Sequence, residues 1–259
     1  MRIASRSNGR TLPLGPDDEA CLDRHPLIGQ ARPEGRAALL AAATQRFVVR
    51  RGLIVQDGDP CPGLHVVLDG IVQICHVATS GRTFVFRLVR AGDSFGEEEV
   101  FVGERHPALA RYAEASTSGP APTPANASAV TDARLLVFPA GAVRSAAGAD
   151  AGLAEGALAV LAGRTLAALE RQQQLALESP AQRIARYLHH HAAESGRGRT
   201  TVCFDVPKVT VAHYLGTVPE VLARHLRRFE KAGVLRRRGN GVLEIVDRTT
   251  LGRWAAGVD

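Results

Sequence analysis

The sequence has 259 residues, of which 45% are hydrophobic, 22% charged and 5% aromatic. These fractions are typical of a folded globular protein and exclude a disordered, collagen-like or disulfide-stabilised chain. The formal net charge is +6, of which residues 180–259 contribute +7 and residues 1–179 contribute −1. Because Lys and Arg that neutralise phosphates release condensed counterions, this basic C-terminal module predicts a polyanionic partner.

The sequence contains no targeting signal. Its N-terminal segment lacks an apolar core followed by a small-residue cleavage site, which predicts no secretory signal. Apolar stretches such as residues 37–43 and 156–163 are shorter than the ~18 residues that span a bilayer. We therefore expect a cytoplasmic protein that does not enter a membrane. The four cysteines are scattered and form no CxxC pair, which supports neither a zinc ribbon nor a disulfide framework, and we expect no metal site.

Residues 17–45 are predicted to be helical, with Pro26 and Pro33 as interruptions. From Phe47 onward, short runs rich in Val, Ile and Phe alternate with Gly and Asp turn residues, which predicts an antiparallel barrel or sandwich. Residues 116–129 are rich in Pro, Ser, Ala and Thr and are expected to form a mobile loop. A last strand ends at Pro139.

Residues 150–178 predict one long helix with a narrow apolar seam. The seam residues are Leu158, Leu161, Thr165, Ala168, Gln172 and Leu175, at alternating steps of three and four. Such a seam is typical of a helix that pairs with a second helix, although it could also pack against its own β domain. Pro180 then starts a further helix, which residues 196–199 are expected to end.

Residues 205–247 give the strongest functional signal. A helix around residues 207–215 is predicted to end at Gly216, and a second helix at about residues 218–232 is predicted to stop at Gly233. Two short helices joined by a turn that contains Gly form the DNA-binding helix-turn-helix unit. The second helix has two faces: Leu222, Leu226 and Phe229 on one, and Glu220, Arg224, Arg227 and Lys231 on the other. One face is predicted to pack and the other to meet DNA.

A hairpin with a Gly-Asn-Gly turn follows the second helix. Arg236, Arg237 and Arg238 lie beside this turn. The pattern predicts a wing whose arginines contact the phosphate backbone.

The sequence resembles the Crp/Fnr transcription regulators. TVPEVLARHLRRFEKAGVL is similar to the recognition helix of that family, with its Glu and Arg four residues apart. VVRRGLIVQDGDPCPGLHVVLDGIVQI and RAGDSFGEEEVFVGERHPALA resemble its β-roll, including Gly96-Glu97 of the ligand cassette. HPALA is similar to the Fnr branch, but the N-terminal cysteine cluster of the iron–sulfur members is absent because Cys21 stands alone there.

The resemblance implies an α+β fold with an N-terminal antiparallel β-roll (a double-stranded β-helix or jelly roll), a long dimerisation helix and a C-terminal winged helix-turn-helix. The expected domains are an N-terminal extension with helices at 1–45, the β-roll effector domain at 46–148 with its mobile insertion at 116–129, the dimerisation helix at 149–178, the DNA-binding domain at 179–250 and a tail at 251–259.

The resemblance also implies that Glu220 and Arg224 enter the major groove, where Arg would donate to guanine O6 and N7 and Glu would accept from cytosine N4. The full predicted DNA-binding set is Thr217, Pro219, Glu220, Ala223, Arg224, Arg227, Arg228, Lys231, Arg236, Arg237 and Arg238. Pro219 and Ala223 differ from the family pattern, which leaves the flanking bases open. Alternatively, Glu220 could form a capping box with Thr217, and the later basic residues could form a solvated face.

The candidate effector-pocket residues are Gly96, Glu97, Glu98, Arg105 and Arg111. Pro107 and Ala108 stand where cyclic-nucleotide-binding members have an Arg-Ser pair for the phosphate. A buried cyclic phosphate without a cation is costly, so cyclic AMP in the usual pose is disfavoured, although Arg105 and Arg111 could substitute.

Haem is an alternative cofactor that the sequence leaves open; it would sense diatomic gases, with nine histidines and Cys75 as potential ligands. Because Cys75 and His76 should point to opposite faces of one strand, both cannot ligate one iron. We therefore expect an effector of unidentified class, a small molecule or a gas.

The leading hypothesis is a homodimeric, sequence-specific transcription regulator that binds a palindromic operator under control of a signal sensed by the β-roll. RNA polymerase would be a further partner. The alternatives are a constitutive DNA-binding regulator with a vestigial pocket and, more remotely, a cupin-type metal enzyme. Residues 47–139 lack the His-x-His, Glu and later His of a cupin, so no enzymatic activity is expected.

Overall fold

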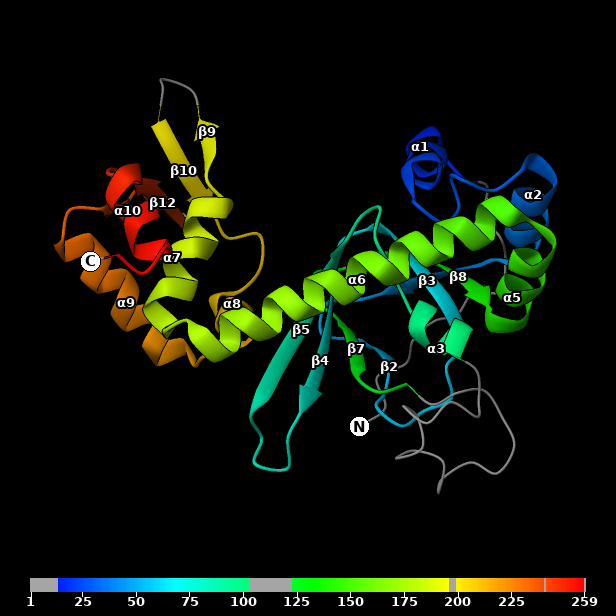
Figure 1. Cartoon of the computed structure of the whole chain (residues 1–259), viewed down its shortest axis with the longest axis horizontal. Helices are drawn as coiled ribbons and strands as arrows, with labels where there is room; N and C mark the ends of the chain where they lie inside the picture. Colours follow the sequence, from blue (N-terminus) through cyan, green and yellow to red (C-terminus); the bar gives the residue numbers. More distant parts are fainter. Residues whose placement is uncertain (1–13, 103–122, 196–198, 240, 259) are drawn as a thin grey trace. The chain divides into compact units, whose positions relative to one another are not determined.

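The computed structural model describes residues 14–102, 123–195, 199–239 and 241–258. The chain divides into two compact units, Met1–Leu166 and Ala167–Asp259. The first unit contains strands β1–β8, and the second contains a smaller sheet with several short helices (Figure 1).

The predicted N-terminal helices are present as α1 (Pro16–Arg24) and α2 (Pro33–Ala42). Each starts with a proline, because the missing N–H of proline costs nothing in the first helical turn. Pro33 therefore begins a helix rather than interrupting one. Leu22 and Leu39 are fully buried and belong to the same apolar cluster as Leu64 and Val66 of β3, so the helices pack on one sheet of the roll.

Two four-stranded antiparallel sheets form the predicted β-roll, with strand orders β1-β8-β3-β6 and β2-β7-β4-β5. The strands are β1 (Thr44–Val48), β2 (Leu53–Val55), β3 (Gly63–Asp69), β4 (Ile71–Val77), β5 (Thr83–Arg90), β6 (Ser94–Phe95), β7 (Asn126–Ala129) and β8 (Ala133–Pro139). Side chains of β3 alternate between two cores: Leu64 faces the helices, whereas Val67 joins Val72 and Leu135 between the sheets.

The mobile loop expected at residues 116–129 requires a correction. Residues 126–129 form β7, which pairs with both β2 and β4. Ala127 and Ala129 are buried in the roll, while Asn126 and Ser128 point to its other side. Because the side chains of this strand are small, their alternation between buried and half-buried positions gives only a weak hydrophobicity pattern in the sequence. Residues 116–122 of the expected loop lie outside the described residues.

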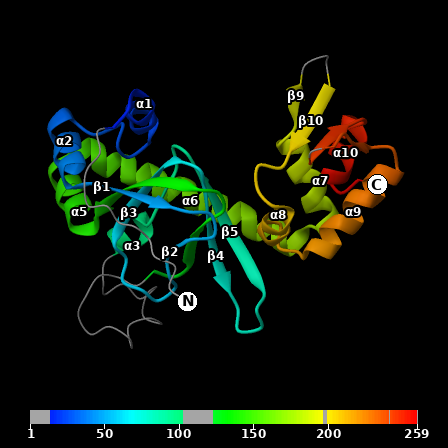
Figure 2. The ribbon, with the colours of Figure 1, turned by 180° about the vertical axis from the view of Figure 1, so that it is seen from behind.

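The described residues of the first unit also form α3 (Glu97–Val102), α5 (Ala140–Ala149) and the start of α6 (Ala151–Leu177). Asp150 determines where α6 begins, because its Oδ1 accepts from the Gly152 N–H at 2.9 Å. Its Oδ2 accepts from the Arg32 N–H at 2.7 Å, which ties α6 to the start of α2. Helices α1, α2 and α5 gather at one end of the roll in both views (Figures 1 and 2).

The predicted long helix is confirmed as α6, and most of it is exposed. Leu153, Gly156 and Ala157 are buried, whereas Leu158 is 68% exposed. By length and composition alone, α6 could also cross a membrane, with a mean hydropathy of 1.3 over its most apolar window. Its leucines and many alanines supply this hydropathy, although the sequence shows no uninterrupted apolar run of that length.

The second unit contains the sheet β11-β12-β10-β9 and four helices after the end of α6. In chain order these elements are α7 (Pro180–His190), β9 (Ala193–Ser195), β10 (Arg199–Cys203), α8 (Lys208–Tyr214), α9 (Pro219–Lys231), β11 (Leu235–Arg237), β12 (Val242–Ile245) and α10 (Arg248–Ala255). The helix predicted from Pro180 to residue 195 ends earlier, at His190. Pairing with β10 satisfies the backbone of residues 193–195 and outweighs the helical propensity of their alanine.

The expected tail at residues 251–259 is also corrected, since α10 contributes to the core of the second unit. Leu251 is fully buried, and the ring of Trp254 lies 4.8 Å from that of Phe229. Asp247 caps α10 by accepting from the Thr250 N–H at 2.9 Å. Helix α10 packs against α7 (Figure 2).

Candidate DNA interface and effector site

Helices α8 and α9 form the predicted helix-turn-helix. Gly216 between them has φ of +64°, the left-handed conformation that glycine adopts without strain. The Thr217 N–H donates to the Ala212 carbonyl at 2.9 Å and closes the turn. The buried face of α9 consists of Leu222, Leu226 and Phe229, as predicted.

A buried arginine of α7 holds this turn in place. Arg183 is 7% exposed and donates through Nε to the Leu215 carbonyl at 2.9 Å. Its two terminal nitrogens donate to the carbonyls of Glu178 and Gly216. A guanidinium that satisfies three carbonyls fixes the start of α9 relative to α7. Sequence reasoning missed Arg183 because an arginine within a helix is usually solvated.

The outer face of α9 carries four exposed side chains, and no ion-pair or hydrogen-bond partner is found for them in the part of the chain that the structure describes. They are Glu220, Arg224, Arg227 and Lys231. The capping box considered for Glu220 is absent, because the N-cap of α9 is Val218 and no side chain caps it. These side chains are therefore free to meet a ligand.

Four other members of the predicted DNA-binding set differ in exposure. Thr217, Pro219 and Ala223 are half-buried. Pro219 is the first residue of α9, where it favours helix initiation. Arg228 is exposed and lines a pocket that also includes Phe229.

The predicted wing is present as the β11–β12 hairpin, with Leu235 paired to Ile245. Its arginines have acidic partners. Arg237 Nε lies 2.5 Å from an oxygen of Glu230 on α9, and Arg238 Nε donates to Glu244 at 2.8 Å. Arg236 Nη1 lies 3.6 Å from the same carboxylate of Glu244. Asn240 of the turn lies outside the described residues.

In the first unit, the cassette residues are positioned by a close backbone crossing. Gly96 has φ of +94°, and a Cβ there would lie 2.5 Å from the Gly63 carbonyl oxygen, so only glycine fits. Glu97 follows at the start of α3 and is fully buried. Its carboxylate accepts from the Ser94 hydroxyl and from both terminal nitrogens of Arg164 on α6.

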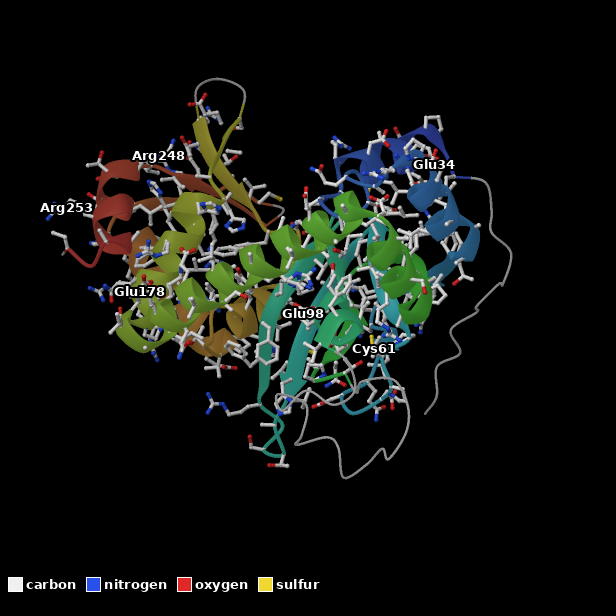
Figure 3. The ribbon with its side chains drawn as sticks, turned by 45° about the vertical axis from the view of Figure 1, so that its right-hand side comes forward. Glu34, Cys61, Glu98, Glu178, Arg248 and Arg253 are labelled. Carbon is white, nitrogen blue, oxygen red and sulfur yellow. The ribbon has the colours of Figure 1, made fainter. Side chains whose placement is uncertain are left out.

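Arg164 is the cation that pairs with the buried carboxylate of Glu97. It also donates to Glu98, which is labelled in Figure 3, at 2.9 Å and to the Ser94 carbonyl at 2.7 Å. Arg87 donates to that same carbonyl at 3.0 Å. Sequence reasoning missed Arg164, although a lone cation within an otherwise apolar helical stretch is a signal that could have identified it.

A hydrogen-bond chain connects this ion pair to the N-terminal segment. His25 Nδ1 accepts from the backbone N–H groups of Leu27 and Ile28, so its Nε2–H donates to the Ser94 hydroxyl at 2.8 Å. Burial, and then the nearby charge of Arg164, lower the pKa of His25 to about 4. A neutral His25 thus links α1 to α6 through Ser94 and Glu97.

The remaining effector predictions are only partly located. Arg105, Arg111, Pro107 and Ala108 lie outside the described residues. Cys75 and Cys61 are both buried, and His76 is exposed.

Among the described residues, the metal and haem candidates do not cluster. His76 lies 3.1 Å from Asp57, on the opposite face of β4 from Cys75, as predicted. Over residues 14–102 and the other described ranges, no group of three His, Cys, Asp or Glu side chains could hold a metal ion.

The predicted seam of α6 is mostly exposed. Leu158, Thr165, Ala168 and Gln172 are exposed, and Leu161 and Leu175 are half-buried. Leu169, which the sequence analysis left out, is 52% exposed. Leu158, Thr165 and Leu169 lie on one face of α6 at helical spacing, so the exposed face is rotated slightly from the predicted seam.

Comparisons with known proteins agree with this architecture. A Crp-like helix-turn-helix domain matches residues 182–254, and a cyclic nucleotide-binding domain matches residues 45–118. The nitrogen fixation regulation protein FixK of Azorhizobium caulinodans is 26% identical over 231 residues, 86% of this chain and 83% of FixK. The CRP-like cAMP-activated global transcriptional regulator of Mycobacterium tuberculosis is 25% identical, over 90% of this chain and 98% of that protein.

The fold is also found among solved structures. FixK2 from Bradyrhizobium japonicum superposes with a TM-score of 0.65 at 20% identity, covering 82% of this chain and 96% of FixK2. With both domain types matched in the same order and transcription regulators as relatives over most of the chain, the protein belongs to the Crp/Fnr family of transcription regulators.

Proposed function

We propose that the protein is a homodimer that recognises a two-fold-symmetric DNA site through α9. The observation that carries this proposal is the exposed row of Glu220, Arg224, Arg227 and Lys231 on the second helix of the helix-turn-helix, for which the described residues offer no ion-pair or hydrogen-bond partner. Such a helix enters the major groove with its N-terminal residues against the base edges. Glu220 and Arg224 are in that N-terminal half, and each good base contact contributes ~1 to 3 kcal/mol of discrimination.

The other basic residues would position the protein on the duplex. Arg227 and Lys231 lie further along α9, and the wing arginines follow it. Contacts to phosphates are independent of sequence and weaken with salt. We therefore assign base recognition to residues 220 and 224 and backbone contact to Arg227, Lys231 and residues 236–238.

The exposed apolar face of α6 supports dimerisation. Leu158 and Leu169 would otherwise lie in water. Pairing with the same face of a second copy buries them, since an apolar stripe along a helix favours a two-helix seam. Two copies would place their recognition helices about one DNA turn, ~34 to 36 Å, apart.

The proposed signal acts at Glu97. An effector that reaches this carboxylate must displace Arg164, so binding would change the contact between α3 and α6. The mycobacterial relative is named as cAMP-activated. Pro107 and Ala108 stand in the phosphate-binding positions of this chain, so we propose a different effector.

A constitutive regulator is the second candidate. It is favoured by the same ion pair, because Arg164 already satisfies Glu97 without a ligand. Purification followed by an absorption spectrum and mass spectrometry of the bound material separates the two, as does DNA affinity with and without a small-molecule extract. The cytoplasm as its location and RNA polymerase as a further partner are also proposals.

Selection of binding sites from random duplexes tests the main proposal. The expected result is an enriched site made of two inverted half-sites, bound by two copies of the chain as measured by light scattering. A selection that yields no enriched sequence, or a single unrepeated half-site bound by one copy, would refute it.

A further inference from the structure

The wing sheet carries a carboxylate at its centre. Glu244 is on β12, which lies between β11 and β10 in the sheet. In the strand register it pairs with Arg236 on one side and Thr201 on the other. Leu243 and Ile245 point into the core, so Glu244 belongs to the opposite face of the sheet.

Three arginines converge on this carboxylate. Arg238 approaches one oxygen of Glu244 with Nε at 2.8 Å and Nη2 at 2.7 Å, and Arg236 Nη1 lies 3.6 Å from that oxygen. Arg199, from β10, places Nε 3.8 Å from the other oxygen. The Glu244 side chain is 10% exposed, whereas those of the arginines are 39% to 58% exposed. The guanidinium groups therefore cover the acid and face solvent.

The charges of this cluster do not cancel. Three guanidinium groups around one carboxylate leave a net charge of +2 for the cluster. Arg237 differs, because it points to another side and pairs one to one with Glu230 of α9. Arg199, Arg236 and Arg238 thus form a surface that attracts anions and that covers the carboxylate of Glu244.

We propose that Glu244 is an intramolecular competitor for DNA phosphates, which holds Arg199, Arg236 and Arg238 together and limits their affinity for any DNA backbone. The inference rests on the proposed DNA-binding function and adds Arg199 to the residues that contact phosphate. A phosphate that approaches the cluster must share the guanidinium groups with Glu244 and is repelled by its charge. Lower backbone affinity increases the share of binding that depends on the base contacts of α9.

The charge of Glu244 can be removed without removing its shape. In Glu244→Gln the amide oxygen still accepts from Arg238, so the cluster keeps its position while the competing charge is lost. The matched control is Glu194→Gln on β9 of the same sheet: it makes the same change of charge at an exposed residue that has no arginine within ion-pair distance among the described residues. Arg199→Gln instead removes one of the three cations of the cluster.

The experiment measures binding of the full chain to a selected duplex and to a scrambled duplex by fluorescence anisotropy across a salt series. Glu244→Gln should tighten binding to both duplexes by a similar factor and steepen the slope of log affinity against log salt by about one unit per copy. Its advantage over the wild type should therefore shrink ~3- to 4-fold per copy between about 50 and 200 mM salt. Arg199→Gln should weaken both complexes equally.

Thermal unfolding of each variant separates folding from binding. Glu244→Gln binding that is no tighter than that of Glu194→Gln, or a gain confined to the selected duplex, would overturn the inference while leaving the proposed function intact. Unaltered DNA binding by Arg199→Gln would also overturn the inference. This second test is independent of whether the Glu244→Gln variant folds. A wild type that binds neither duplex at low salt would instead refute the proposed function and the inference with it.

Discussion

Replacing Arg164 with Met tests whether the ion pair with Glu97 holds α6 against the effector domain. Glu97 is fully buried and the Arg164 side chain is 16% exposed, so the substitution leaves a buried carboxylate without its cation. Breaking a buried pair by removing one partner costs ~3 to 5 kcal/mol. The contact to Glu98 adds less than ~1 kcal/mol, because that carboxylate is half-exposed. For a unit of this size the loss corresponds to a decrease in Tm of roughly 6 to 20 °C.

A double variant distinguishes a lost ion pair from a general packing defect. In Glu97→Gln/Arg164→Met both charges are absent, and the Gln amide still accepts from the Ser94 hydroxyl. Because replacing both members of a buried pair is close to neutral, the double variant should recover at least half of the stability lost in Arg164→Met.

Two probes locate the effect. Trp254 is the one tryptophan of the sequence and lies in the second unit, so its fluorescence follows that unit, whereas circular dichroism follows both. Arg164→Met should lower the circular dichroism transition of the first unit and leave the fluorescence transition nearly unchanged. An unchanged first transition, or a double variant whose loss equals the sum of the two single losses, would refute the reasoning.

Three further predictions follow from the same structure. Leu169→Glu should shift the protein to single copies in analytical ultracentrifugation, because it places a charge in the exposed apolar face of α6; an unaltered oligomeric state would exclude that face. Arg183→Met should destabilise the second unit by ~2 to 4 kcal/mol, seen as an earlier Trp254 fluorescence transition, since three carbonyls lose a charged donor. Like His25, His65 of β3 is buried, and burial lowers the pKa of both side chains from the ordinary 6.5 to about 4, so the unfolded chain binds more protons between these values. Stability should be complete above about pH 6.5 and fall by ~2 kcal/mol per histidine at pH 5, and a first-unit Tm that is equal at pH 7 and pH 5 would contradict this.

The spacing of the apolar residues and the glycines at the turns were sufficient to locate the elements that position the DNA interface. The 3.6-residue spacing of Leu222, Leu226 and Phe229, with Gly216 and Gly233 at the turns, determines both the extent of α9 and its outer face. These are local features, because the backbone of a short helix and its caps depends on residues close in the sequence.

Elements that depend on distant partners were harder to predict. Ala127 and Ala129 become a strand only because β2 and β4 provide hydrogen bonds on both sides. Leu251 and Trp254 form a helix in the core because α7 and α9 cover them, and nothing within ten residues of the sequence indicates this cover. In both cases tertiary contacts outweigh the secondary-structure propensity of the local sequence.

The ion pairs of the two sites could not be predicted from a sequence pattern for a similar reason. Glu97 and Arg164 are 67 residues apart, and only the packing of α6 on α3 brings them together. Glu244 lies on the face of β12 opposite to Leu243 and Ile245, but which arginines meet it depends on the register of β12 with β11 and β10. The sequence analysis therefore placed the wing arginines correctly on the hairpin and missed their acidic partners.

The most direct test of the account compares Arg224→Ala with Arg237→Ala on a selected site and on scrambled DNA. Arg224 is exposed on the outer face of α9, and Arg237 belongs to the wing. If α9 recognises bases, Arg224→Ala loses ~1 to 3 kcal/mol of affinity for the selected site, or about 5- to 150-fold, and little for scrambled DNA. Arg237→Ala should weaken both complexes by a similar factor. Equal binding of the selected site by Arg224→Ala and the wild type would contradict the central claim that this helix recognises the DNA sequence.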